Sequence, residues 1–523
     1  MKRQIKIAFG AFLLAAISLL YPFIVKSQTA KALSVAHTEA GTVSGVKNNA
    51  GDVTAFKGVP FAAPPVGDLR WKAPQPAKHW DGIKKCDAFS ASPMQPEPKP
   101  FMVYTSEFLI PEKPISEDCL YLNMWTNAKI KTAKKPVYVW IYGGGFTSGG
   151  SACPIYDGEA MAKKGIIFVS INYRVGVFGF LAHPELTKES PDKASGNYGL
   201  LDQIAALNWI KKNISAFGGD PDNVTIGGQS AGSMSVNSLV ASPLAKGLFK
   251  RAIAESGSFL IKNPILANNN LQGAEEQGSK LAEKAGSKSL ADMRAMSAED
   301  VLKKFQGRFA PIVDGYVLPE AVADIFAKGN QNHVPLLTGW NADEAFVTNF
   351  KNAADFKKQA QDQYGADAET FLKYFPAGTD DEAKDSQIEV SRDMIFALSG
   401  YKWAGIQSKD AKGTVYVYNF NRRVPAEGNM VQFRAFHTAE VPYVMDDLKF
   451  LNRPLQPADH ALSKLMSAYW VNFIKTGNPN GKGLPAWPKY NTDQYQVKLF
   501  DVQSSTGKLP GKDGLDFLLS RAK

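Results

Sequence analysis

The sequence predicts an α/β protein with a large, mostly parallel central sheet flanked by helices. Two observations lead to this prediction. The composition is that of a globular chain, with 44% hydrophobic and 21% charged residues among 523. From residue 119 onward, short apolar runs alternate with segments of helical periodicity. Such alternation is typical of parallel sheets, because the connection between two parallel strands is usually a helix.

The expected strands are apolar runs rich in β-branched and aromatic residues. They cover Cys119–Trp125, Val137–Tyr142, Ile166–Asn172, Val224–Ile226, Arg251–Glu255, Leu336–Gly339 and Val415–Phe420. An amphipathic helix is expected over Leu201–Ile214, and the proline-rich residues 87–116 are expected to form a long loop. N-terminal strands should precede this region.

The domain organisation is predicted to be simple. Residues 1–32 are an export segment, and residues 33–523 form one domain without internal repeats. Two stretches, about 262–306 and 352–412, are rich in Ala, Lys, Glu and Gln and interrupt the strand rhythm. We expect them to be helical insertions that cap a site.

The N-terminus has the pattern of a signal peptide. Basic residues at positions 2, 3 and 6 precede the uncharged run Ile7–Val25, and Ala30-Lys31-Ala32 gives an A-x-A cleavage pattern, with Ser34-Val35-Ala36 as a second option. The protein is therefore expected to be periplasmic or secreted. Alternatively, the run of about 20 residues is long enough to serve as an uncleaved membrane anchor.

Charge and cysteine content exclude several function classes. The formal charge of +10 falls to +6 without the four cations of the first thirty residues. So small an excess on a large body does not indicate nucleic-acid binding. Three widely spaced cysteines without a companion histidine do not form a zinc pattern, so no metal is expected.

The strongest chemical signal is Gly228-Gln229-Ser230-Ala231-Gly232, a G-x-S-x-G sequence. It follows a β-branched strand and precedes a helix, which is the context that a nucleophile elbow requires. The small residues permit a tight turn that exposes the Ser230 hydroxyl. The next backbone N–H, at a helix N-terminus, faces the place where an oxyanion would form.

A second set of donors is expected at the end of an earlier strand. Val137–Tyr142 leads into Gly143-Gly144-Gly145-Phe146, where consecutive glycines let backbone N–H groups turn inward. A phosphate-binding loop would need Gly-Lys-Ser/Thr at its end, and Thr147 follows here instead.

The general base is found by elimination. In this class of fold the acid and then the histidine follow the nucleophile in the chain. After Ser230 only His333, His437 and His460 remain. His333 lies at the wrong end of its strand and His460 opens an amphipathic helix, which leaves His437. The acid is expected after the strand at Leu336, where the residues alone do not choose between Asp343 and Glu344.

These motifs make the chain resemble the type-B carboxylesterases, the α/β-hydrolase family that includes the cholinesterases. The resemblance covers most of the mature chain. It is carried by Phe56–Ala62, Pro64–Trp71, Ser116–Asn123, Gly143–Phe146, Asn197–Gln203, Phe217–Pro221, Gly228–Gly232, Glu255–Ser258, Asp343-Glu344, His437 and Glu440–Val444.

The resemblance assigns roles to the site residues. It implies that Ser230 is the nucleophile, Glu344 the acid and His437 the base. The implied oxyanion donors are the backbone N–H groups of Gly144, Gly145 and Ala231, with Ser256 as a supporting polar group. It further implies a disulfide between Cys86 and Cys119 that closes a loop over the site, which leaves Cys153 free.

The chain departs from the family pattern at three places. Gln229 replaces a frequent Glu, Ala345 replaces a Gly after the acid, and no Trp occurs between Cys86 and Cys119. A neutral amide and a missing aromatic face both remove attraction for a quaternary ammonium, so a choline-ester specialist is not expected.

The resemblance implies a serine carboxylic-ester hydrolase that uses water and needs no cofactor. Two alternatives remain: a hydrolase specialised for a bulky ester or an amide, and a catalytically silent binding protein on the same fold. The presence of all three triad residue types disfavours the silent protein.

Overall fold

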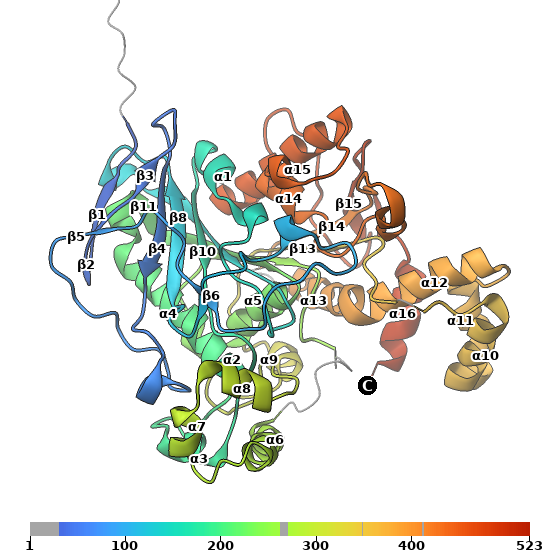
Figure 1. Cartoon of the computed structure of the whole chain (residues 1–523). Helices are drawn as coiled ribbons and strands as arrows, with labels where there is room; N and C mark the ends of the chain where they lie inside the picture. Colours follow the sequence, from blue (N-terminus) through green and yellow to red (C-terminus); the bar gives the residue numbers. More distant parts are fainter. Residues whose placement is uncertain (1–30, 262–269, 348, 411–412, 523) are drawn as a thin grey trace, which may run out of the picture. The chain divides into compact units, whose positions relative to one another are not determined.

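The centre of the fold is a mixed sheet in which a parallel block carries antiparallel strands at both edges (Figure 1). The computed structural model describes residues 31–261, 270–347, 349–410 and 413–522. Within them the sheet has 11 strands, in the order β16-β15-β14-β13-β12-β11-β9-β10-β8-β4-β3. Their bounds are β3 Val46–Lys47, β4 Thr54–Pro60, β8 Tyr121–Thr126, β9 Lys135–Ile141, β10 Ile167–Ile171, β11 Gly219–Gln229, β12 Arg251–Glu255, β13 Leu336–Asn341, β14 Val415–Phe420, β15 Gln496–Phe500 and β16 Ser505–Lys508.

The parallel block runs from β10 through β9, β11, β12, β13 and β14 to β15. Strands β10, β12, β13 and β14 are buried along their whole length, because helices cover both faces of the sheet. The predicted fold class is therefore confirmed. The predicted bounds of β12 and β14 are the observed ones, whereas Val224–Ile226 is only the central part of the longer β11.

Helices lie on both faces of this sheet (Figure 1). One layer contains α1 (Glu159–Lys163), which packs on β10, and α15 (Pro457–Thr476), which packs on β9. The other layer contains α4 (Tyr198–Asn213) and α5 (Ala231–Ala241), and α5 packs on β11 and β12. Further helices outside the two helical insertions are α2 Gly176–Phe180, α3 Pro184–Glu189, α9 Val322–Ala327, α14 Val441–Met445 and α16 Lys512–Arg521.

Two helical segments interrupt the strand order where they were expected. The first contains α6 (Leu271–Lys284), α7 (Leu290–Ala295) and α8 (Ala298–Lys304). The second contains α10 Ala353–Tyr364, α11 Ala368–Tyr374, α12 Asp380–Arg392 and α13 Leu398–Ser408. Because α13 packs on β13 and β14, it acts as the crossover helix between these two parallel strands.

The N-terminal part adds two small sheets. The order β1-β2-β5 joins Val35–Thr38, Gly41–Ser44 and Ile83–Lys85, and β6 (Ser92–Pro93) pairs with β7 (Ile115–Ser116). Residues 87–116 are otherwise largely a loop, as predicted. Residues from Ala32 onward form one compact unit, and the predicted export segment lies, except for its last two residues, outside the described residues.

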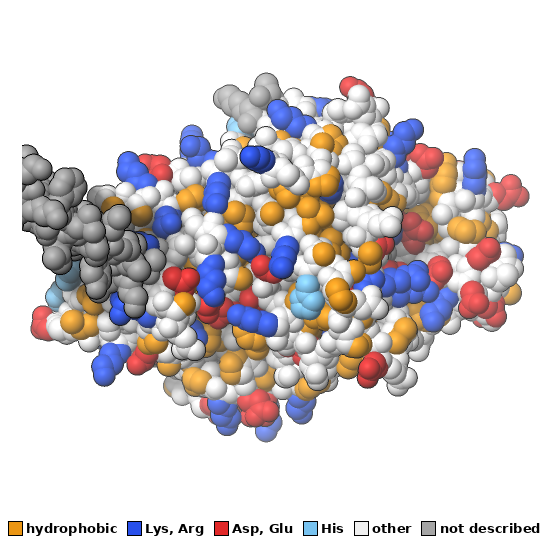
Figure 2. Space-filling model, turned by 90° about the horizontal axis from the view of Figure 1, so that it is seen from above, with side chains coloured by type: hydrophobic (Ala, Val, Ile, Leu, Met, Phe, Trp, Pro, Cys, Tyr) orange, Lys and Arg blue, Asp and Glu red, His pale blue; other side chains and the backbone are white. Residues whose placement is uncertain are grey.

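Surface and composition features agree with a protein without a dominant charge field. On the face shown in Figure 2, Lys and Arg side chains are interspersed with Asp, Glu and apolar side chains.

In the described part of the chain, no helix is long and apolar enough to cross a membrane. The same residues contain no cluster of three His, Cys, Asp or Glu side chains that is arranged to hold a metal ion.

Candidate active site

Ser230 occupies a strained turn between β11 and α5. Its φ and ψ are 60° and −124°, which is unusual for a residue with a side chain, and such strain is typical of a nucleophile elbow. The neighbouring glycines explain how the turn is possible. A Cβ at Gly228 would lie 2.6 Å from the backbone of Gly232, and a Cβ at Gly232 would lie 2.0 Å from the Ile141 carbonyl oxygen. The G-x-S-x-G spacing therefore reflects a steric requirement.

The glycine loop after β9 lies beside this turn. A Cβ at Gly143 would lie 2.7 Å from the Gln229 carbonyl oxygen, so the loop and the elbow are in direct contact. Gly144 and Gly145 have φ values of 113° and 62°, which glycine adopts without strain. Among the described residues, the backbone N–H groups of Gly144, Gly145 and Ala231 donate to no other group. They are available to an oxyanion in the adjoining cavity.

His437 and Glu344 form the most direct polar contact of the site. His437 Nδ1 donates to Glu344 Oε2 at 2.7 Å, and both side chains are buried. Glu344 Oε1 accepts a second hydrogen bond, from the backbone N–H of Asn341 at 2.9 Å. Because the proton on Nδ1 is held by the carboxylate, Nε2 is left as the acceptor that a general base requires.

The two neighbouring carboxylates have different partners in the structure. Asp343 accepts hydrogen bonds from Arg434 Nη1 at 3.4 Å and from the backbone N–H of Ala435 at 3.2 Å. Its carboxylate is thus occupied by the residues that precede His437, whereas Glu344 contacts the imidazole itself. This geometry favours Glu344 as the acid.

Aromatic side chains enclose His437. Phe396 stacks on the imidazole with ring centres 4.2 Å apart, and the Phe346 ring approaches edge-on at 5.5 Å. The Tyr104 hydroxyl donates to the backbone carbonyl of His437 at 2.8 Å. Phe396 belongs to a π-helical turn, Asp393–Ala397, and such turns are frequent at functional sites. Sequence reasoning missed all three residues, and no motif marks them.

Gln229 lies between the elbow and the histidine. Its Nε2 is 3.1 Å from His437 Nε2 and 3.2 Å from Nδ1, and its Oε1 accepts from the Thr438 hydroxyl at 3.2 Å. Among the described residues, no hydrogen bond joins Ser230 Oγ to His437. Hydrogen bonds of this kind are often formed only when substrate is bound.

Ser256 supports the backbone around the nucleophile. It follows β12 with a φ of 56°, and its N–H donates to the Gly339 carbonyl at 2.9 Å. The preceding Glu255 carbonyl accepts from the N–H of Ser230 at 2.9 Å. The buried Ser256 hydroxyl has no hydrogen-bond partner among the described residues.

Ser230, His437, Gln229 and the glycine loop line one cavity of about 810 Å³, whereas Glu344 and Ser256 lie behind its wall. Its wall comes from the loop of residues 95–110, the glycine loop, the segment after α8 and the π-helical turn, so both helical insertions contribute. The apolar lining includes Phe108, Met234, Phe305, Phe309 and Phe396. Among the described residues, Glu97 and Lys99 are the only ones of formal charge in the lining, and both are exposed.

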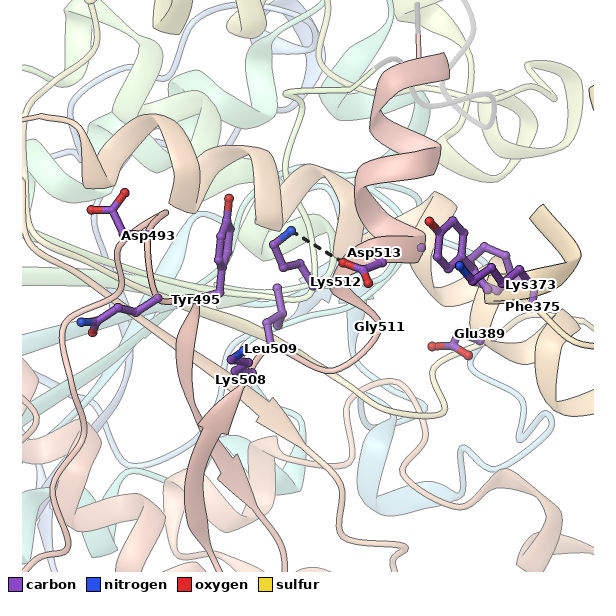
Figure 3. Close-up of a pocket in the computed structure, with 13 residues that line it drawn as sticks. Lys373, Phe375, Glu389, Asp493, Tyr495, Lys508, Leu509, Gly511, Lys512 and Asp513 are labelled. Carbon is purple, nitrogen blue, oxygen red and sulfur yellow. Dashed lines mark ion pairs between the residues drawn. The ribbon is translucent and has the colours of Figure 1, made fainter. Parts of the chain in front are cut away.

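A second hollow of about 590 Å³ lies between α11, α16 and the loop before β15 (Figure 3). Lysines 373, 508 and 512 line it together with Glu389, Asp493 and Asp513. Among the described residues, its wall contains none of the serine, cysteine or histidine side chains from which a Ser–His or Cys–His pair is built.

Comparison with known proteins agrees with this geometry. The sequence pattern of the family described as "Carboxylesterase family" matches residues 32–517. The chain belongs to the carboxylesterase family. It is 35% identical over 510 residues to fumonisin B1 esterase of Sphingopyxis macrogoltabida, which covers 92% of this chain and 89% of that protein. It is 34% identical over 491 residues to para-nitrobenzyl esterase of Bacillus subtilis (strain 168), with 89% and 94% covered.

A solved structure entitled PNB esterase has the same fold. Its TM-score is 0.75 at 32% identity, and the match covers 93% of this chain and all of that one. The resemblance seen in the sequence motifs is therefore confirmed. This carboxylesterase is a carboxylic ester hydrolase of the type-B group.

The disulfide implied by the resemblance is not formed in this carboxylesterase. Cys86 and Cys119 are free, buried thiols, and so is Cys153. The Cys86 carbonyl accepts a hydrogen bond from the N–H of Lys57. The carbonyl of Leu120, the residue after Cys119, accepts one from the N–H of Phe61. Cys86 therefore lies beside the Lys57–Gly58 part of β4, whereas Cys119 lies beside the chain that follows the end of this strand.

The segment that does approach Cys119 lies further along the chain. Met94 and Cys119 line the same small hollow beside Trp71. The loop of residues 87–116 therefore passes beside Cys119 at Met94, and Met94 cannot form a disulfide. The disulfide prediction was wrong because the family resemblance was carried over to Cys86, whereas Met94 is the residue of this loop that lies beside Cys119.

The two other histidines after Ser230 lie outside the site. His333 precedes β13 and pairs with Asp410, and His460 is exposed in the first turn of α15. Their exclusion from catalysis on sequence grounds agrees with these positions.

Proposed function

We propose that this carboxylesterase transfers the acyl group of a carboxylic ester to water through Ser230, His437 and Glu344. The observation that carries the proposal is the buried 2.7 Å hydrogen bond between His437 and Glu344, in a cavity that the strained Ser230 elbow also lines. Ser230 and His437 both line this cavity and Glu344 contacts His437, which supports the roles of nucleophile, base and acid for these three residues.

The reaction follows from the roles of the atoms. His437 Nε2 takes the proton of Ser230 Oγ as the oxygen forms a bond to the ester carbonyl carbon. The N–H groups of Gly144, Gly145 and Ala231 stabilise the resulting oxyanion. The imidazolium then protonates the alcohol oxygen as the C–O bond breaks. A water molecule then attacks the acyl carbon as His437 takes its proton, the bond between this carbon and Ser230 Oγ breaks, and His437 returns the proton to Oγ, which releases the acid and the free serine.

Neutral esters with apolar groups fit the cavity best. The lining is mostly aromatic and aliphatic, and its two charged residues, Glu97 and Lys99, oppose each other in sign. The neutral Gln229 side chain, not a carboxylate, faces the histidine. Neither feature attracts a cationic alcohol such as choline.

A panel of p-nitrophenyl esters tests the proposal. Wild-type protein should hydrolyse short and medium acyl chains, and the S230A variant should not. Absence of turnover by folded wild-type protein on every ester would favour the silent binding protein. Turnover of an anilide at a rate near that of the matched ester would favour the amidase.

A bulky ester is the second candidate substrate. The 35% identity to the protein named fumonisin B1 esterase favours this reading. Release of carboxylic acid from fumonisin B1, measured beside the p-nitrophenyl panel, tests it. A specialist should prefer the bulky ester by kcat/KM, whereas a generalist should prefer the simple ones.

Export is a further part of the proposal. It is supported by the basic N-terminus, the apolar run Ile7–Val25 and the Ala30-Lys31-Ala32 pattern. N-terminal sequencing of protein from the periplasm or medium should find a chain that begins at Leu33, or at His37 if the second pattern is used. Intact chain in the membrane fraction would indicate an uncleaved anchor.

A further inference from the structure

Asn341 contacts both loops that carry the acid and the base. It is the last residue of β13 and is fully buried, three positions before Glu344. Its backbone N–H donates to Glu344 Oε1 at 2.9 Å. Its side-chain Nδ2 donates to the Phe436 carbonyl at 2.8 Å and to Glu440 Oε2 at 2.5 Å. One residue therefore holds the acid from one side and the chain before and after His437 from the other.

We propose that Asn341 is a positioning residue that sets the Glu344–His437 contact by fixing the histidine loop to the end of β13. The proposal rests on the catalytic roles proposed above. It adds a function for a residue that touches neither substrate nor the reacting atoms.

The histidine loop needs such an anchor because regular structure supplies little support. Between β14 and α14 the chain forms only a short 3₁₀ segment, Gly428–Phe433. Beyond Asn341, few groups hold the chain at His437 itself. The Tyr104 hydroxyl holds the His437 carbonyl, and Asp343 holds the N–H of Ala435. The Asn341 side chain contacts the chain on both sides of the imidazole.

The side-chain partner of Asn341 is the buried carboxyl group of Glu440. Burial, together with the nearby charges of Glu255 and Glu344, raises the pKa of Glu440 well above its usual value. Asn341 Nδ2 donates and Glu440 Oε2 accepts, so the two side chains form a donor–acceptor match between the end of β13 and the residues after His437.

A donor–acceptor exchange tests this match. N341D keeps the side-chain shape but loses both N–H donors. We expect kcat to fall by about 10- to 100-fold with KM within about threefold, because small displacements of catalytic groups have effects of this size. E440Q alone keeps an acceptor oxygen for Asn341 and should change kcat less than about threefold. The double variant N341D/E440Q restores a donor, from the new glutamine, and should recover at least about fivefold over N341D.

N419D is the matched control. Asn419 is also buried, on the adjacent β14, and its Nδ2 donates to the Trp340 carbonyl at 3.1 Å without reaching the histidine loop. N419D should lower the melting temperature while kcat stays near that of the wild type. The low-field proton NMR signal of the His437 Nδ1–H should weaken or shift in N341D, persist in N419D and return in the double variant.

The outcomes separate this inference from the proposed function. Wild-type protein that neither turns over esters nor reacts with a fluorophosphonate would remove the proposed function itself. Active wild-type protein with unchanged kcat and NMR signal in N341D would overturn only the role of Asn341, as would a double variant no better than N341D. If N341D does not fold, N341S, which is too short to reach Phe436, provides the same comparison.

Discussion

Glu344 and His437 are 93 residues apart in the chain, yet His437 Nδ1 donates to Glu344 Oε2 at 2.7 Å in a buried environment. This contact fixes the imidazole tautomer and places an opposite charge beside the imidazolium that forms during acyl transfer. The parallel order of β13 and β14 explains it. Both strands end at the same edge of the sheet, so the loops that follow them meet there.

Removal of the nucleophile or the base should abolish turnover without unfolding the protein. S230A and H437A are expected to lower kcat by about 10⁴-fold or more, because the triad acts as one unit. H460A is the control, since His460 is exposed on α15, and it should retain full activity. A fluorophosphonate probe followed by peptide mapping should label Ser230. Modification of a different serine would contradict the assignment.

The two neighbouring carboxylates should differ sharply. E344Q leaves His437 Nδ1 without a carboxylate partner, so kcat should fall by about 10²- to 10⁴-fold. D343N removes a contact to Arg434 and Ala435 and should cost about tenfold or less. Steady-state kinetics of both variants on one p-nitrophenyl ester make the comparison. The reverse order of effects would move the acid to Asp343.

The charge at position 229 should control preference for the alcohol group. Q229E places a carboxylate beside His437, where it would attract a cation in the leaving group. We expect kcat/KM for a choline ester, relative to its neutral 3,3-dimethylbutyl isostere, to rise by about tenfold. Q306E adds the same charge at an exposed position on the cavity wall and should have a smaller effect. An equal rise in both variants would show that general cavity charge, and not position 229, sets the preference.

Stability should fall as pH rises because of Glu255. Burial raises its pKa from 4.5 to about 8, although the hydrogen bond from Trp470 Nε1 acts in the opposite direction. Between these pH values the folded state binds a proton that the unfolded chain releases. The free energy of unfolding therefore decreases over this range, and the contribution is lost as pH passes 8.

The isosteric variant E255Q removes this titration and keeps an acceptor for Trp470. Its melting temperature should decline less between pH 5 and pH 9 than that of the wild type. E369Q, at an exposed position on α11, should follow the wild-type profile. Parallel profiles for wild type and E255Q would show that Glu255 does not titrate in this range.

The sequence could predict those parts of the site that depend on local geometry. The Ser230 elbow and the glycine loop are recognisable because steric contacts, such as that of Gly232 with the Ile141 carbonyl, admit only small residues. The strands were predictable because burial on both faces demands continuous apolar runs. His437 could be found because the chain offers few histidines after the nucleophile.

Features that depend on distant contacts could not be predicted. The choice of Glu344 over Asp343 depends on which carboxylate Arg434 and Ala435 occupy. Phe396 reaches His437 from a π-helical turn inside a segment that was predicted to cap a site, but no motif in that segment marks the turn or the ring. The disulfide prediction failed for the same kind of reason, because the family resemblance that implied it does not reveal beside which part of β4 a cysteine of this chain lies.

The cysteines provide a last test, and it follows from their positions. Cys86, Cys119 and Cys153 are all free and buried, and burial raises the pKa of each thiol, that of Cys86 to about 11. Ellman's reagent should therefore react slowly with native protein, because little thiolate is present at neutral pH. Denatured, non-reduced protein should give three thiols per chain, and C153S should give two. A single thiol in protein isolated from an oxidising compartment would show that Cys86 and Cys119 do form a bridge and that the loop of residues 87–116 is rearranged.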